Sequence, residues 1–306
     1  MRLGVSLRTA YDPGDVHERA SWIIERARAA RDAGLDSLFV GDHHATGPFS
    51  YFQNVPLMGR LLAEWPDVPV AGVLMLLPLW QPVLAAEQLG TLASLARGPF
   101  VLQCALGGGE HQFAAMGVPI RDRVARFEQG LGIIRQLLAG EKVTVDDGPY
   151  RAEEARIAPI SERPVEVWIG ASAPKAIERA ARMGDGWLAD AGVSPDEARE
   201  QADQYRAACA ALGREPGVIA IRRDVHVGTD AADAERVAGP IVAGGYRGFR
   251  PEACTYGGPH EVSDSLGQYA ELGYTDVIVR HLANDQTEVL GSLERLASVR
   301  TALAEH

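Results

Sequence analysis

Cysteine, positive charge and uninterrupted apolar runs are scarce in this sequence, and each shortage excludes a class of protein. The 306 residues include 3 cysteines, which lie far apart without a C-x-x-C pair, so neither a disulfide framework nor a zinc cluster is indicated. The 30 lysine and arginine residues face 41 aspartate and glutamate residues, which gives a net charge of −11. Because nucleic acid attracts basic surfaces, a nucleic-acid partner is not expected.

The stretch from Val68 to Ala86 carries no charge and is long enough to suggest a membrane span, but three prolines and a glutamine interrupt it. This pattern instead predicts a strand, a turn and a helix that opens at Pro82. The first residues also reach charged side chains and Pro13 too soon for a secretory apolar segment. These features predict a cytoplasmic protein without a membrane partner.

What remains is the composition of an ordinary globular protein, with 46% hydrophobic and 23% charged residues. The length fits either two domains or one large barrel. Eight short apolar runs are expected to be strands: Leu3–Leu7, Ser37–Val40, Val70–Leu77, Phe100–Leu106, Val165–Ile169, Gly186–Ala189, Val218–Val227 and Asp276–Arg280. Helical periodicity occupies the segments between and after them: 15–33, 52–64, 82–96, 121–139, 174–184, 195–212, 230–243, 259–272 and 286–304.

Strands that alternate with helices pair in parallel. Three junctions repeat one pattern, in which a helix ends at a glycine before a short polar link into the next strand: Gly34, Gly184 and Gly273. We expect each glycine to adopt the left-handed conformation that ends a helix. The repeated unit and the lack of a linker predict one domain over residues 1–306, an α/β chain folded as a single (β/α)8 TIM barrel with long loop insertions at 141–164 and 244–258.

Chemistry in such a barrel sits where strands end and βα loops begin. Asp42, His43 and His44 follow the second predicted strand. Adjacent residues of an extended segment point to opposite faces, so the two histidines are poorly placed to bind one metal ion. We expect His43 to transfer a proton or contact a cofactor, with Asp42 fixing its tautomer. The alternative is that either histidine only caps the strand.

Three consecutive glycines follow the fourth predicted strand: Gly107, Gly108 and Gly109. They allow a cofactor to approach the backbone closely, and Glu110 and His111 stand beside them. The spacing matches neither a dinucleotide fingerprint nor a P-loop. The alternative interpretation is a plain turn.

Four small residues follow the fifth predicted strand and lead into a helix: Gly170, Ala171, Ser172 and Ala173. Small residues before a helix N-terminus leave backbone N–H groups and a hydroxyl that can bind a phosphate. Lys175 adds positive charge at the same end. The alternative is an ordinary N-cap at Ser172.

Titratable residues on the last two predicted strands are weaker candidates. Alternation places Arg222, Asp224 and His226 on one face of the seventh strand, and Arg280 and His281 end the eighth. Charged side chains that point into a barrel are costly unless they are paired. These residues therefore either line the site or face a loop.

Four segments together resemble the bacterial luciferase-like superfamily of flavin- and deazaflavin-dependent oxidoreductases: GDHHATGPF at 41–49, VAGVLMLLPLWQPVLAAEQLGTL at 70–92, LGGGEHQFAAMGV at 106–118 and WIGASAPKAIERAARMGDGW at 168–187. The resemblance implies a (β/α)8 barrel, commonly a homodimer, that binds FMN or coenzyme F420 at its C-terminal mouth. A small-molecule substrate would lie over the cofactor ring.

The resemblance also assigns roles by position. His43 matches the family's active-site histidine, and Asp42 matches its acidic neighbour. The family often has a bulge with a non-proline cis peptide behind the cofactor ring. Here that bulge falls within Ala71–Leu74, so Gly72, Val73 and Leu74 are expected to bind the cofactor.

Three further assignments follow from the same resemblance. Gly107, Gly108 and Gly109 match the turn beside the cofactor, and Glu110 matches the acidic residue of the deazaflavin branch. The segment from Gly170 to Ala173 matches the loop on the phosphate side. Ala105 stands where the luciferase catalytic subunit has a reactive cysteine, so light emission is not expected.

The fourth segment and Glu110 are closer to the deazaflavin branch, so F420 is expected and FMN is the alternative. With F420 the enzyme would transfer hydride, and with reduced FMN it would be a monooxygenase, because the cofactor sets the reaction class. Two other hypotheses stay open. One is a metal-dependent barrel hydrolase built on Asp42, His43, His44 and His111, and the other is a non-catalytic flavin-binding protein.

Overall fold

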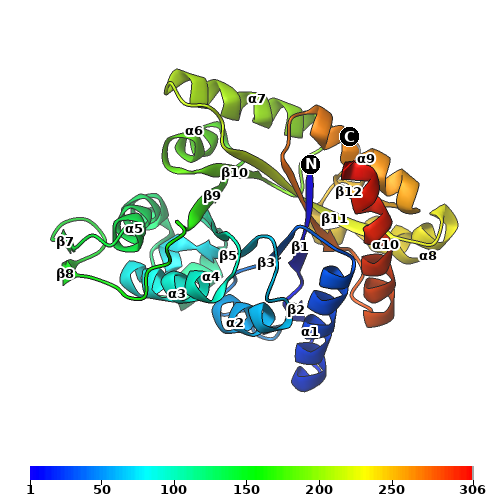
Figure 1. The fold of residues 1–306 in the computed structure, drawn as a ribbon, viewed down its shortest axis with the longest axis horizontal. Helices are drawn as coiled ribbons and strands as arrows, with labels where there is room; N and C mark the ends of the chain where they lie inside the picture. The colour runs from blue at the N-terminus through cyan, green and yellow to red at the C-terminus, as the bar shows by residue number, and fades with distance from the viewer. Residues whose placement is uncertain (305–306) are drawn as a thin grey trace. The chain divides into compact units, whose positions relative to one another are not determined.

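The computed structural model describes residues 1–304, in which strands and helices alternate as the sequence predicts (Figure 1). The main strands are β1 (Arg2–Leu7), β3 (Ser37–Val40), β5 (Ala71–Leu76), β6 (Phe100–Ala105), β9 (Glu166–Gly170), β10 (Gly186–Ala189), β11 (Val218–Val227) and β13 (Asp276–His281). Every one of them begins and ends within one residue of its predicted range.

The helices also follow the predicted periodicity. They are α1 (Val16–Asp32), α2 (Asn54–Glu64), α3 (Pro82–Leu95), α4 (Glu110–Ala115), α5 (Arg123–Leu138), α6 (Pro174–Met183), α7 (Pro195–Ala211), α8 (Ala231–Ala243), α9 (Pro259–Glu271) and α10 (Gln286–Ala304). Of these, only the short α4 is absent from the sequence prediction. Shorter elements are β2 (Ala10–Tyr11), β4 (Ser50–Tyr51), β7 (Val143–Val145), β8 (Ala152–Ala155), β12 (Cys254–Gly257) and four 3-10 turns, η1 (Leu77–Leu79), η2 (Ile120–Asp122), η3 (Tyr246–Gly248) and η4 (Pro251–Ala253).

The main strands belong to one sheet with the order β10-β9-β6-β5-β3-β1-β13-β11-β12, and β10 also pairs with β11. The eight main strands therefore close on themselves, with a helix after each. This topology confirms the predicted (β/α)8 barrel. The chain forms two compact units, and the boundary between them passes through β3 and β9.

The first unit comprises residues 1–8, 20–39 and 168–304. Its central strand, β11, pairs in parallel with β13, which in turn pairs with β1. The other edge of β11 is shared, because β10 pairs with its first half and β12 with its second half. Helices α6 and α7 lie side by side beyond β10, and α9 lies beside α10 (Figure 1). Fully buried Trp187 stacks on Tyr205 with 5.4 Å between ring centroids and anchors the core on the α7 side.

The second unit comprises residues 9–19 and 40–167, and its sheet pair is β5 with β6. The register runs from Ala71 opposite Phe100 to Leu76 opposite Ala105 without a shift. The pairing with β6 therefore has no bulge within Ala71–Leu74, and the cis peptide expected there is absent. The cis peptide bonds found between residues 1 and 304 are Gly47–Pro48 and Ala158–Pro159, outside this strand.

Two of the three predicted helix-ending glycines behave as expected. Gly34 and Gly273 have φ of +70° and +78°. Gly184 is extended instead, with φ −95° and ψ 159°. Glycine is needed there for space, because a Cβ would lie 2.8 Å from the backbone oxygen of Gly186 and 2.9 Å from that of Ala180.

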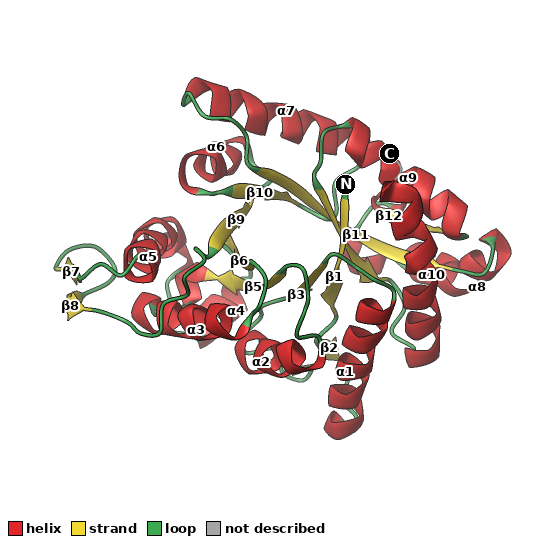
Figure 2. Cartoon of the chain, viewed as in Figure 1, coloured by secondary structure: helices red, strands yellow, loops and turns green. Residues whose placement is uncertain are grey.

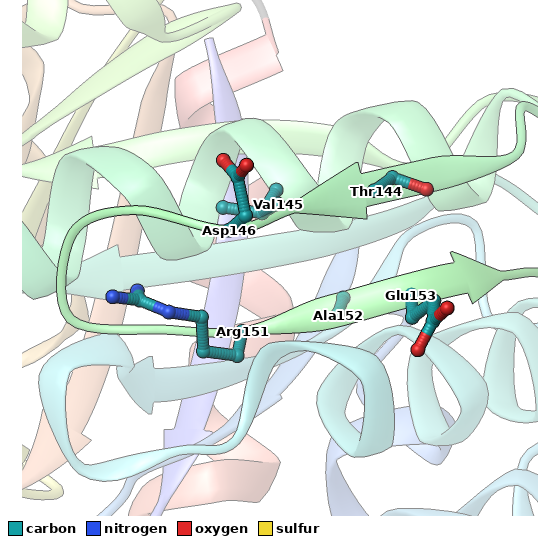
Figure 3. Close-up of a pocket in the computed structure, with 6 residues that line it drawn as sticks. All are labelled: Thr144, Val145, Asp146, Arg151, Ala152 and Glu153. Atoms are coloured by element: carbon teal, nitrogen blue, oxygen red, sulfur yellow. The ribbon is translucent and has the colours of Figure 1, made fainter.

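The first long insertion, 141–164, contains the antiparallel hairpin of β7 and β8, which a long loop joins to β9 (Figure 2). A hollow of about 440 Å³ opens on this hairpin, and Asp146 and Arg151 extend from its two arms (Figure 3). None of the predicted site residues lines this hollow. The second insertion, 244–258, folds as η3, η4 and β12.

The charge-free stretch that begins at Val68 becomes β5, η1 and the start of α3, as predicted. Throughout residues 1–304, each helix is too short or too polar to cross a membrane.

Candidate active site

Asp42 lies two residues after the end of β3, and its side chain is fully buried. Its Oδ2 accepts two hydrogen bonds of 2.8 Å, one from the backbone N–H of Leu76 and one from the indole Nε1 of Trp80. Leu76 ends β5, and Trp80 follows η1. A buried carboxylate held by two donors in this way binds the end of β5 to the segment after β3.

The second oxygen of Asp42 contacts His44 rather than His43. Its Oδ1 lies 3.2 Å from His44 Nε2, and the His44 ring meets the Trp80 ring edge to face at 5.6 Å. Side chains two residues apart on an extended segment share a face, whereas neighbours oppose each other. The prediction that Asp42 fixes the tautomer of His43 is therefore wrong, and His44 is its partner.

His43 lies on the opposite face and is exposed. Its ring packs edge to face against Tyr51 of β4 at 5.5 Å between centroids. Its backbone oxygen accepts a 3.1 Å hydrogen bond from Gln53 Nε2. The backbone position of His43 is thus held, while its imidazole remains accessible to a ligand.

Gln112 connects this segment to the glycine turn. It is buried in α4, where its Oε1 accepts a 2.9 Å hydrogen bond from the backbone N–H of His44. Its Nε2 donates a 3.2 Å hydrogen bond to the backbone oxygen of Gly108. The sequence analysis did not identify Gln112. The residue lies two positions after Glu110, in the short helix α4 that was not predicted.

Asn54, at the start of α2, contacts β5, the strand that contains the expected cofactor-binding residues 72–74. Its Nδ2 donates to the backbone oxygen of Leu74. Gly72 and Val73 are buried within β5, and Leu74 is the member of this expected cofactor-binding trio that reaches the surface in part. Asn54 was also missed by sequence reasoning, although a fully buried asparagine at a helix start must find partners.

The glycine turn is open. Gly107 and Gly109 have φ of +69° and +85°, which favours glycine at both positions. A Cβ at Gly108 or Gly109 would meet no atom within 4 Å, so the space beside the backbone there is clear. Glu110 begins α4, and its side chain is exposed beside this turn.

The phosphate-side loop belongs to the first unit. Trp187 Nε1 donates a 2.8 Å hydrogen bond to the backbone oxygen of Ala171, and Ala171 N–H donates to Leu188 at 3.2 Å. Ser172 and Ala173 are exposed beyond this anchor. The N-cap of α6 is Ala173, which provides no side-chain cap, so the alternative of a capping Ser172 is wrong.

The polar stripe on β11 divides into separate environments. Arg222 Nε and Asp224 Oδ1 form a 2.8 Å ion pair. His226 is fully buried without a hydrogen-bond partner for either ring nitrogen among residues 1–304, and burial lowers its pKa. On β13, burial and the nearby charge of Arg26 lower the pKa of His281 to about 3.

Across residues 1–304, no group of three or more His, Cys, Asp or Glu side chains is arranged to hold a metal ion. The set required by a metal-dependent hydrolase is split between Asp42 and His44, which contact each other, and the exposed rings of His43 and His111. The geometry does not assemble the ligands that this alternative requires.

The sequence profile of the luciferase-like monooxygenase family matches residues 1–276. The chain belongs to this family, which confirms the resemblance carried by its four segments. An F420-dependent glucose-6-phosphate dehydrogenase of Beutenbergia cavernae is 35% identical over 174 residues, which cover 53% of this chain and 50% of the relative. The match thus covers about half the length of this relative.

Two solved structures share the fold. A monooxygenase, RslO1 from Streptomyces bottropensis, aligns with a TM-score of 0.83 at 17% identity and covers 97% of this chain and 98% of its own. An F420-dependent secondary alcohol dehydrogenase in complex with an F420-acetone adduct aligns with a TM-score of 0.81 at 18% identity, covering 99% and 98%. At these identities the alignments establish the barrel fold alone.

Proposed function

We propose that this protein is an F420-dependent oxidoreductase that transfers hydride between the cofactor and a small organic substrate. One arrangement carries the proposal: Asp42 and Gln112 join the ends of β3, β5 and β6 at one place in the second unit. These are the strand ends where a barrel enzyme keeps its chemistry. The exposed imidazole of His43 lies at the same place.

Two segments, one in each unit, have features that suit either the ring or the anionic tail of a cofactor. Gly108 and Gly109 leave clear space beside the backbone of the turn, where a ring can approach without meeting a side chain, while Leu76 lies beside Gly107. In the first unit, α6 begins without a side-chain cap and has Ser172 and Lys175 exposed at its start. Its backbone N–H groups and the helix dipole favour a bound anion.

Bound F420 supplies a carbon centre that accepts or donates hydride. His43 performs the complementary step in our proposal, because one of its imidazole nitrogens accepts the substrate proton when hydride leaves and returns it in the reverse direction. Tyr51 and Gln53 hold the residue in position. Asp42 is a positioning residue, since its carboxylate is buried against His44, Leu76 and Trp80. Glu110 is the second proposed catalytic residue, beside His43.

The names of similar proteins support F420 over FMN. The curated relative is an F420-dependent dehydrogenase, and one solved neighbour is an F420-dependent alcohol dehydrogenase. The family description and the RslO1 neighbour support the FMN monooxygenase as the alternative. The proposal includes a homodimer in the cytoplasm. In support of a reducing compartment, all three cysteines are buried and form no disulfide within residues 1–304.

Direct titration tests the cofactor. Purified protein is titrated separately with F420 and with FMN, and quenching of cofactor fluorescence gives each Kd. We expect F420 to bind at least about tenfold more tightly, a difference of about 1.4 kcal/mol. Tighter binding of FMN, with oxygen consumption in the presence of a reductase, would establish the monooxygenase instead. Binding of either cofactor without turnover of any alcohol or aldehyde would indicate a non-catalytic carrier.

A further inference from the structure

The ends of β11 and β13 in the first unit gather several arginines around one carboxylate. Asp224 is fully buried. Its Oδ1 accepts a 2.8 Å hydrogen bond from Arg222 Nε, and its Oδ2 accepts one of the same length from the hydroxyl of Tyr246. Arg222 therefore donates a hydrogen bond to one carboxylate oxygen, and Tyr246 of η3 donates one to the other.

Arg280 stands beside this carboxylate without forming an ion pair with it. The two residues are opposite each other in the parallel register of β11 and β13. The Nε of Arg280 is shielded from solvent and has no hydrogen-bond acceptor in the described chain. Burial, together with the charges of Arg222 and Arg247, lowers the pKa of the Arg280 guanidinium to about 10. A guanidinium in this setting is costly unless an anion pairs with it.

Arg247 adds the third positive charge from the 244–258 insertion. It is exposed in η3 with φ +52°, a left-handed conformation that is uncommon for arginine. Its guanidinium lies 5.4 Å from the centre of the Phe249 ring. Tyr246 and Phe249 pack on an apolar cluster that includes Val242, Cys254 and Leu282, which fixes the segment that carries Arg247.

The charges do not balance within this group. Arg222, Arg247 and Arg280 contribute three positive charges, and Asp224 contributes one negative charge, which leaves a net charge of two. A phosphate monoester carries about −1.5 to −2 at pH 7, whereas a carboxylate or a phosphate diester carries one negative charge. Guanidinium groups also match the oxygens of a phosphate in paired hydrogen bonds.

We propose that Arg222, Arg247 and Arg280 form a binding site for the dianionic phosphate monoester of a ligand. Asp224 and Tyr246 serve as its scaffold, because they orient Arg222 and tie η3 to the end of β11. The proposed site uses neither Ser172 nor Lys175, and its test does not require the hydride chemistry proposed above.

Inorganic phosphate is the probe, titrated into the purified protein at pH 8 with sodium chloride at equal ionic strength as the reference. Calorimetry gives the Kd and thermal unfolding gives the Tm shift. The variants are Arg280→Met, which keeps the apolar stem, and Arg247→Met, which changes an exposed residue and should not affect folding. The control is Arg236→Met on α8, because Arg236 is exposed and already paired with Asp233 and Glu288.

We expect phosphate to raise the Tm of the native protein and of the control, and Arg280→Met to weaken phosphate binding by about 10- to 100-fold. Without phosphate, Arg280→Met should be as stable as the native protein or more stable, since it removes a partly buried positive charge whose Nε has no acceptor. Arg247→Met should weaken binding to a smaller extent.

Two ligands could bring this phosphate, and separate titrations distinguish them. If Arg280→Met binds a sugar phosphate more weakly but binds FMN as the native protein does, the phosphate belongs to a substrate. If Arg280→Met weakens binding of FMN but not of the sugar phosphate, the phosphate belongs to FMN. The proposal is overturned if phosphate shifts the Tm no more than chloride does. Equal loss of phosphate affinity in Arg280→Met and Arg236→Met would also overturn it.

Discussion

Side-chain alternation after β3 separates the roles of Asp42, His43 and His44. Asp42 and His44 share a buried face with Trp80, while His43 projects to the surface beside Tyr51. The period of two was sufficient to predict that the histidines oppose each other. It did not identify the partner of Asp42, because that depends on Leu76 and Trp80, which come from a segment more than 30 residues away. Residue type therefore suggested the candidate residues, and tertiary contacts divided them into buried and accessible ones.

His43→Ala should lower turnover by about 10²- to 10⁴-fold, the usual effect of losing an acid or base group. The side chain is exposed, so the free energy of unfolding and the Kd for F420 should change little. Steady-state kinetics and fluorescence titration measure the two effects separately.

The matched control is His260→Ala on α9, because His260 is also exposed and pairs only with neighbouring Asp264 in the described contacts. The control should keep native turnover. Native turnover in His43→Ala would remove His43 from the mechanism.

Among the elements, the strands with strong apolar character were predictable and the short polar ones were not. β5 and β11 are continuous apolar or alternating runs, and their ends were predicted to within one residue. β8 has the sequence AEEA, which carries no strand pattern, and it exists because β7 lies antiparallel to it. Similarly, α4 has six residues, too few for a helical period to be visible. Because Gln112 lies in α4, the contact that joins two parts of the site was hidden with it.

At the start of α6, Ser172→Ala and Lys175→Ala should each weaken binding of F420 by about 10- to 100-fold, equivalent to about 1–3 kcal/mol, and leave kcat unchanged. The reason is that this helix has no side-chain cap, so the hydroxyl and the ammonium are available to an anion. Lys142→Ala is the control, since Lys142 is the other lysine of the sequence and pairs with Glu154 on the β7–β8 hairpin. If all three variants bind F420 alike, the loop is an ordinary connection.

The ends of β11 and β13 should make the protein sensitive to acid. Burial lowers the pKa of His281 to about 3 and also lowers that of His226, whereas an unfolded histidine titrates near 6.5. Between these values the unfolded chain binds protons that the folded chain does not, so stability falls as the pH falls from about 6.5 toward 3. One such histidine gives a slope of at most about 1.4 kcal/mol per pH unit.

Urea unfolding at pH 7.5 and pH 5 measures this loss of stability. In His281→Leu, the free energy of unfolding should differ less between pH 7.5 and pH 5 than in the native protein, because leucine does not titrate. His260→Leu is the control, since His260 is 88% exposed. An equal pH dependence in the native protein and in His281→Leu would show that another group causes the acid sensitivity.

At the scale of the whole molecule, the barrel does not decide the reaction. Proteins with F420 chemistry and with monooxygenase chemistry align to this chain with TM-scores of 0.81 and 0.83. The same strands and helices therefore support both. We therefore expect the choice of cofactor to depend on side chains in the loops, and the sequence favoured F420 through the segment 168–187 and Glu110.

Glu110→Gln tests that choice, because it keeps the shape of the side chain and removes the proton that the carboxyl can hold. If F420 is the cofactor and Glu110 holds the proton gained with hydride, the variant should bind F420 with near-native affinity and lose most of its hydride transfer, by about 10²-fold or more. Glu110 is exposed at the start of α4, so the substitution should not change the free energy of unfolding. Stopped-flow absorbance of F420 reduction measures the step directly. The neighbouring exposed residue provides the control, since His111→Gln changes the same turn without removing the carboxyl. Full hydride transfer in Glu110→Gln, together with tight binding of FMN by the native protein, would contradict the F420 assignment and favour the monooxygenase.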